Sequence, residues 1–238
     1  MQIKKLFIAL GIVLPLHMQG QNFLIKDAPE VIESYVNQFN REDNELYKQD
    51  IPNCGASDFL RKNIPFFECP DKELEKTYYF RWWTYRKHIK KTPDGFVITE
   101  FLPDVPWAGK YNTISCAANH HFYEGRWLRN AEILSDYASF WFSGSGSPRL
   151  YSFGAADAIY NYYLIHNDKM LLADLYPKLK DNFAKWEEEK RDSTGMFWQV
   201  DDRDGMEMSV SGHLSEGGRG YRPTINSYMY GEAVALAK

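Results

Sequence analysis

The clearest helical pattern in the chain lies in Asp71-Lys-Glu-Leu-Glu-Lys-Thr-Tyr-Tyr-Phe-Arg-Trp-Trp-Thr-Tyr-Arg-Lys-His-Ile-Lys90. Its apolar side chains recur three or four residues apart, which places them on one face of a helix. They are Leu74, Tyr78, Trp82, Tyr85 and Ile89. The stretch therefore predicts an amphipathic helix that packs against a core.

The same periodicity predicts further helices along the chain. They cover residues 28–48, 117–142, 152–166, 172–186 (with Pro177 at the start or at a kink) and 223–238, and only 95–101 reads as a strand. The fold class is therefore mostly α. The longer loops, including 103–112 and 200–221, fall between alternate helices, so helical hairpins around one axis would gather them at one end. Periodicity alone does not separate a toroid from a solenoid.

Composition narrows the function classes. Of the 238 residues, 44% are hydrophobic and 25% charged, which is enough apolar material for a sizeable core. The net charge of −4 removes the electrostatic case for a nucleic-acid partner. Aromatic residues reach 16%, more than a core normally needs. An aromatic-rich helical core accounts for most of them, and the excess favours stacking on sugars.

The N-terminus indicates the compartment. Lys4 and Lys5 precede an apolar run over residues 6–16, and a polar stretch follows, which is typical of a signal peptide over residues 1–20. No later segment has the ~18 apolar residues that a membrane span needs. We expect residues 21–238 to form one exported unit, periplasmic or extracellular.

The three cysteines do not form a disulfide framework, because an odd number cannot be fully paired. Cys54 and Cys69 could close a loop in an oxidising compartment or remain free, and both readings stay open. Cys116 stands among small residues and is expected to be buried.

Four carboxylates gather within residues 197–209: Asp201, Asp202, Asp204 and Glu207. Mutual repulsion and the adjacent aromatic side chains would raise the pKa of at least one of them. A carboxyl that holds its proton near neutral pH is what acid-catalysed glycoside cleavage requires. A calcium loop does not fit, because Val200 and Ser211 occupy its first and last ligand positions. A solvated acidic turn is the alternative reading.

A second polar and aromatic cluster spans residues 107–112 and 119–127. It offers rings for stacking and groups for sugar hydroxyls: Trp107, Asn112, Glu124, Arg126 and Trp127. The neighbouring His120 and His121 lack partners at metal-ligand spacing, so we expect no metal and no cofactor. Serine-nucleophile and phosphate-loop motifs also fail.

Two segments carry a resemblance to a known family. Residues 204–209 (Asp-Gly-Met-Glu-Met-Ser) and 221–232 (Tyr-Arg-Pro-Thr-Ile-Asn-Ser-Tyr-Met-Tyr-Gly-Glu) resemble the central part of the six-hairpin glycosidases, the group of trehalase, processing α-glucosidase I and mannosylglycerate hydrolase. Glu207 occupies the position of the family's general acid, which is an Asp there. Met206 stands where the family has Trp, so stacking at that point must come from elsewhere.

The resemblance implies an (α/α) toroid, an inverting hydrolase and a carbohydrate substrate. Glu207 would protonate the leaving oxygen, and Asp202 or Asp204 would raise its pKa or bind hydroxyls. The implied contacts to the sugar are stacking by Trp107, Trp127 and Trp198 and hydrogen bonds from Arg126, Arg222 and Asn226.

The family's catalytic base lies on a later hairpin, beyond Lys238. The chain also stops inside an apolar helical pattern, so we expect it to be about the first half of a toroid. We expect these 238 residues alone to express poorly or to self-associate, and to show no glycosidase activity.

Two other classes remain. A polysaccharide lyase of the helical-toroid type would use Asn119, His120, Tyr123 and Arg126. A non-catalytic carbohydrate-binding protein would keep its affinity when Glu207 is replaced and would have no rate to lose.

Overall fold

The computed structural model describes residues 28–142, 144–205 and 218–238, and its fold is mostly α. Its helices are α1 (Ala28–Glu42), α2 (Ala56–Asn63), α3 (Lys72–Lys87), α4 (Ser115–Gly125), α5 (Glu132–Phe142), α6 (Ala155–His166), α7 (Lys169–Lys190) and α8 (Pro223–Leu236). Two short antiparallel pairs accompany them, β1 (Ile89–Thr92) with β2 (Gly95–Ile98), and β3 (Trp198–Val200) with β4 (Arg219–Tyr221). The predicted signal peptide lies outside the described residues.

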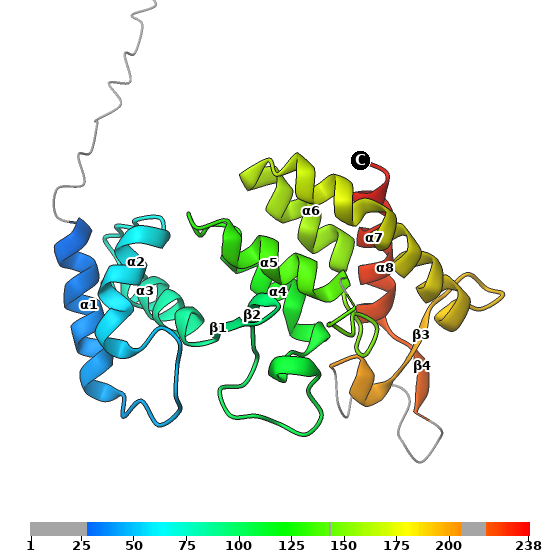
Figure 1. Ribbon diagram of the computed structural model, residues 1–238. Coiled ribbons are helices and arrows are strands. Elements are labelled where there is room, and N and C mark those ends of the chain that lie inside the picture. The colour runs from blue at the N-terminus through cyan, green and yellow to red at the C-terminus, as the bar shows by residue number, and fades with distance from the viewer. Residues whose placement is uncertain (1–27, 143, 206–217) are drawn as a thin grey trace, which may run out of the picture.

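The helices from α4 onward form two curved layers (Figure 1). Helix α6 packs between α4 and α8 in one layer, and α5 packs beside α7 in the other. Helix α4 is followed along the chain by α5 of the second layer, and α6 is followed by α7, as in a row of helical hairpins. Together with α1–α3 at one side, they fit part of the (α/α) toroid that the resemblance implies.

All the long connections of this row lie at one end of the helices (Figure 1). Residues 99–114, 144–154 and the described parts of 191–222 precede α4, α6 and α8, so they meet at the N-terminal ends of these helices. Gly205 lies against Cys116 at the start of α4, where a Cβ atom on the glycine would be 3.3 Å from the thiol sulfur. The prediction that the loops at 103–112 and 200–221 share one end is therefore confirmed for the described residues.

Several predicted boundaries are wrong for local reasons. Residues 117–142 form two helices, because α4 ends at Gly125 and the Asn130 side chain accepts a hydrogen bond from the Glu132 backbone at the start of α5. Helix α1 ends at Glu42 and α6 begins at Ala155. Helix α7 does not start at Pro177, because the Asp168 carboxylate caps it at Leu171, two turns earlier, and Pro177 lies inside the helix.

Helix α3 is buried on two sides, which explains why the predicted stripe is only partly right. Trp82 and Tyr85 are buried as predicted, whereas Leu74 is 53% exposed. Tyr79 and Trp83, outside the stripe, are also buried and face α1. Residue Ile89 lies beyond the helix in β1.

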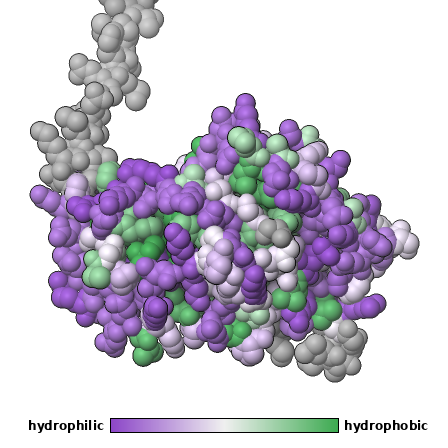
Figure 2. Space-filling model, viewed as in Figure 1, coloured by the Kyte–Doolittle hydropathy of each residue, from purple (hydrophilic) through white to green (hydrophobic). Residues whose placement is uncertain are grey.

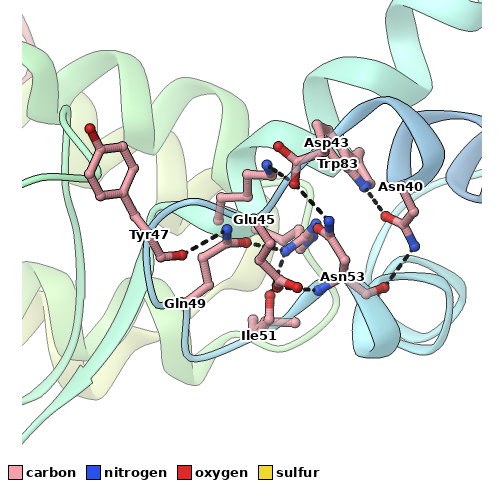
Figure 3. A network of polar contacts seen from close by, with 10 residues as sticks. Asn40, Asp43, Glu45, Tyr47, Gln49, Ile51, Asn53 and Trp83 are labelled. Atoms are coloured by element: carbon pink, nitrogen blue, oxygen red, sulfur yellow. Dashed lines mark hydrogen bonds and ion pairs between the residues drawn. The ribbon is translucent and has the colours of Figure 1, made fainter.

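A buried polar network ties the segment after α1 to α3 (Figure 3). Arg86 is fully buried and donates hydrogen bonds to the side chains of Gln49 and Asn53 and to the carbonyl of Ile51. The Lys87 ammonium lies 2.7 Å from the Asp43 carboxylate, which also accepts a hydrogen bond from Asn53. Such a network fixes an irregular segment whose backbone would otherwise lack partners.

The outer surface is mainly polar, with apolar side chains scattered among charged ones in the view of Figure 2. Among the described residues, no helix has the length and apolar character needed to cross a membrane. None of the cysteines Cys54, Cys69 and Cys116, which all lie in the described part of the chain, forms a disulfide, and Cys54 is exposed.

Gly125 permits the close approach of α3 and α4, and its replacement should destabilise the fold. A Cβ atom at this position would overlap the Tyr85 hydroxyl, which is buried and donates to the His121 carbonyl at 2.8 Å. Gly125→Ala should therefore cost about 1–3 kcal/mol of unfolding free energy in urea titrations. Gly231→Ala in α8 is the matched control, because its nearest neighbour would lie at 3.7 Å, and it should be neutral or stabilising. Equal effects of the two substitutions would contradict this packing.

Candidate active site

The acidic segment is anchored to the N-terminal end of α8. Residues 201–203 form a 3-10 turn directly after β3, and the buried Asp201 carboxylate lies 2.5 Å from the guanidinium of Arg222. Arg222 immediately precedes Pro223, the first residue of α8, and is 2% exposed. A buried, charge-assisted pair of this kind fixes the direction in which the segment leaves the strand.

A second contact anchors the same segment to the N-terminal end of α6. The Ser152 hydroxyl donates to the Asp204 carboxylate at 2.5 Å, and the Ser152 backbone N–H donates to the Arg203 carbonyl at 2.8 Å. Burial raises the pKa of Asp204 above its ordinary value, although the hydrogen bonds from Ser152 and Thr224 oppose the rise. The predicted rise is confirmed for Asp204, with burial as its main cause and the charge of Asp201 as a minor one.

Trp198 and Asn226 lie next to this anchored segment. The Lys190 ammonium is 3.9 Å from the centre of the Trp198 ring, and the Arg219 guanidinium carbon is 4.3 Å from it. The Asn226 amide binds both the N–H and the carbonyl of Phe197, so it holds the chain just before β3. Asp202 is half-buried, and its Oδ1 atom has no hydrogen-bond partner among the described residues.

The loop before α4 presents Trp107 and is organised by Asn112. The buried Asn112 side chain accepts from the Val105 backbone and donates to the carbonyls of Phe101 and Pro103. Its own φ is +64°, a left-handed conformation that Asn tolerates. Trp107 is 53% exposed and packs edge-on against Phe101. Asn112 thus shapes the loop, and Trp107 is the side chain that the loop exposes.

The other predicted residues of the second cluster lie elsewhere. Glu124, Arg126 and Trp127 stand at the C-terminal end of α4, an 11-residue helix, so roughly 16 Å of helix separates them from the loops at its N-terminal end. Glu124 pairs with Arg81 of α3, and Arg126 donates to Asn161 of α6. The structure does not bring this group together with Asp202, Asp204 and Trp107.

Glu232, which the sequence did not single out as a site residue, is buried between α8 and α6. Its Oε1 atom accepts hydrogen bonds from the backbone N–H groups of Ala156 and Asp157, so it caps α6 from a neighbouring helix. Its Oε2 atom has no partner among the described residues, and burial raises its pKa to about 8. No local spacing signals such a tertiary cap.

Glu207 lies outside the described residues, two positions after Gly205. In the part of the chain that the structure describes, no group of three or more His, Cys, Asp or Glu side chains is placed to hold a metal ion. Among the described residues, five side chains therefore define the candidate site near the N-terminal ends of α4, α6 and α8. They are the anchored carboxylates of Asp201 and Asp204, the half-buried carboxylate of Asp202, and the rings of Trp107 and Trp198.

Comparison with known proteins gives one family and one structural relative. The family model of the mannosylglycerate hydrolase MGH1-like glycoside hydrolase domain matches residues 110–238. A solved structure of a sialidase superposes with a TM-score of 0.81 and 42% sequence identity, and the match covers 88% of this chain and 20% of that chain. No curated protein matches. The matched region contains α4 to α8 and the anchored acidic segment, and the chain belongs to the MGH1-like glycoside hydrolase family.

Proposed function

We propose that the protein is an exported glycosidase that hydrolyses an oligo- or polysaccharide with inversion, using Glu207 as the general acid. The observation that carries the proposal is the anchoring of residues 201–205 by Arg222 and Ser152 at the shared N-terminal end of α6 and α8. Glu207 follows this anchored segment by two residues in the sequence. Inverting hydrolysis requires an acid held in a fixed position beside the glycosidic oxygen.

The acid acts together with a base on the opposite face of the sugar. In an inverting reaction the two carboxyl groups stand ~6.5–9.5 Å apart, which leaves room for the attacking water. By the resemblance to six-hairpin glycosidases, we expect this base on a later hairpin. The negative charges of Asp202 and Asp204 favour the protonated form of a neighbouring carboxyl group, which is the form that donates to the leaving oxygen.

The predicted sugar contacts divide into two roles. Trp107 and Trp198 present rings at this end of the helices and are proposed to stack on the substrate. Arg222 and Asn226 use their polar groups on Asp201 and on the Phe197 backbone, so we propose that they act as positioning residues for the acidic segment and do not bind the sugar hydroxyls.

The lyase alternative receives no support from its candidate base. Tyr123 donates a hydrogen bond to Asp157, and burial together with that carboxylate raises the pKa of the phenol. A tyrosine that abstracts a proton needs a lowered pKa. Asn119, another of the four residues named for a lyase, is buried with 1% of its surface exposed.

Product analysis on the natural protein that carries this chain tests the proposal. Mannosylglycerate and sialosides are the first substrates to assay, because the matched family and the matched structure bear those names. Hydrolysis should release a reducing sugar whose anomeric configuration, followed by NMR in the first minutes, is opposite to that of the substrate. Retention would contradict the inverting mechanism, and an unsaturated uronide that absorbs in the ultraviolet would indicate a lyase.

A further inference from the structure

A groove runs between α3 and α4, away from the proposed active site. It consists of two neighbouring cavities of about 400 and 190 Å³ that share Arg81 and Glu124 in their walls. The Arg81 guanidinium binds the Glu124 carboxylate through two hydrogen bonds, of 3.0 and 2.5 Å. The ion pair thus stands where the two cavities meet.

The larger cavity is lined by aromatic side chains from both helices. Tyr78 and Trp82 come from α3, and Tyr123 and Trp127 from the end of α4. Trp127 is 46% exposed, so its ring offers a surface at the mouth of the cavity. The guanidinium of Arg126 lies 5.1 Å from the centre of this ring and supports it. Rings arranged in this way match the flat apolar faces of sugars.

The smaller cavity has a polar lining with an unused hydrogen-bonding group. Thr99 is completely buried in its wall, and the Thr99 hydroxyl has no hydrogen-bond partner among the described residues. A buried hydroxyl without a partner is costly, so a polar ligand or a water is needed to satisfy it. His121 also lines this cavity, and burial lowers its pKa to about 3, so the imidazole is neutral at physiological pH.

The charges around the groove favour a neutral ligand. The cation of Arg81 and the anion of Glu124 compensate each other, and His121 carries no charge. Glu100 also lines the smaller cavity and adds an acidic side chain, which disfavours an anionic ligand further. A uronate or sialic acid would find no unpaired cation among these three residues, whereas hydroxyl groups can both donate to and accept from them.

From this arrangement we propose that the α3–α4 groove is a second carbohydrate site, which binds a neutral oligosaccharide through Trp127 and Thr99. It lies toward the C-terminal end of α4, whereas the loops of the proposed active site lie at its N-terminal end. The site would hold a long glycan away from the bond that is cleaved, and it does not depend on the chemistry assigned to Glu207.

Binding to an array of immobilised neutral and acidic oligosaccharides tests this site in the natural protein. The Glu207→Gln substitution is used throughout, so that affinity is measured without turnover. Trp127→Ala should weaken binding to a neutral glycan at least ten-fold, and Trp127→Phe should retain most of the affinity because it keeps a ring. Tyr176→Ala is the matched control, since Tyr176 in α7 is similarly exposed and lines neither cavity of the groove.

Thr99→Val separates a ligand role from a structural one. Because the Thr99 hydroxyl has no partner in the described fold, its removal should leave the melting temperature unchanged or higher while weakening glycan binding several-fold. A lower melting temperature with unchanged binding would overturn the proposal. So would equal binding by the Trp127→Ala and parent proteins, binding restricted to acidic glycans, or an array without any bound glycan. If the unmodified enzyme, with Glu207 intact, hydrolysed no glycoside, that result would contradict the proposed function and not this binding site.

Discussion

Replacing Glu207 by Gln should lower the hydrolysis of an unactivated glycoside by about 10²–10⁴-fold, the usual cost of losing a general acid. The amide of the new side chain has nearly the same shape as the carboxyl group but cannot donate a proton to the leaving oxygen. An activated aryl glycoside has a leaving group that departs without protonation, so its rate should fall much less. The measurement is kcat/KM on both substrates for the natural enzyme and the variant.

The control for this experiment is Glu188→Gln, on the exposed face of α7. It removes one carboxylate from the same protein and should leave both rates unchanged. An equal loss on the natural and the aryl substrate after Glu207→Gln would show that Glu207 binds the ring or supports the fold. Unchanged rates on both would exclude it as the acid, and unchanged affinity in a protein without any turnover would favour a carbohydrate-binding module.

Glu232→Gln should change how stability depends on pH. Burial raises the pKa of Glu232 from its ordinary value of 4.5 to about 8, so the folded protein holds a proton that the unfolded chain releases between these values. Stability from this group is therefore complete below pH 4.5 and is lost as the pH rises toward 8. This rise in pKa corresponds to at most about 5 kcal/mol of unfolding free energy between low and high pH, at 1.36 kcal/mol for each pKa unit.

Urea unfolding at pH 5 and pH 8 measures this effect. The parent protein should lose more stability between the two pH values than Glu232→Gln, because the amide keeps an acceptor for Ala156 and Asp157 and does not ionise. Glu75→Gln is the control. Burial favours the neutral form of Glu75, but hydrogen bonds from Cys69, Lys72 and Tyr35 outweigh it and lower the pKa below 4.5. Its stabilisation is therefore lost only at pH values below this window, and Glu75→Gln should keep the parent's change between pH 5 and pH 8. Parallel pH profiles of the parent and Glu232→Gln would contradict the assignment.

Local sequence signals predicted most of the helices and the end at which the loops gather. They depend on residues three or four positions apart, so they can be recognised without knowledge of contacts between distant segments. The pattern over residues 117–142 predicts a single helix because its apolar spacing is continuous and no proline marks a break. The actual break is made by Gly125, where α4 ends, and by Asn130, which caps α5. The strand β1 was missed because Ile89 continues the helical spacing of α3, and its pairing with Ile98 is a contact between separate segments.

The candidate site was less accessible to sequence reasoning, because its geometry depends on contacts between distant residues. Trp107 and Trp127 belong to one aromatic-rich region of sequence, but α4 places them at opposite ends. Asn112 and Asn226 were predicted to bind sugar hydroxyls or to line the pocket, and the structure shows their amides bound to backbone groups of Phe101, Pro103 and Phe197. Glu232 carries no motif, and only the packing of α8 on α6 reveals its role.

The most direct test of the account is a crystal structure of the natural protein with Glu207→Gln and a bound oligosaccharide substrate. We expect the scissile glycosidic oxygen within hydrogen-bond distance of the amide that replaces the Glu207 carboxyl, at the N-terminal ends of α4, α6 and α8 and beside Asp202 or Trp198. A structure in which the scissile bond of a cleavable glycan lies away from that position, for example in the α3–α4 groove, would contradict the assignment of Glu207 as the general acid.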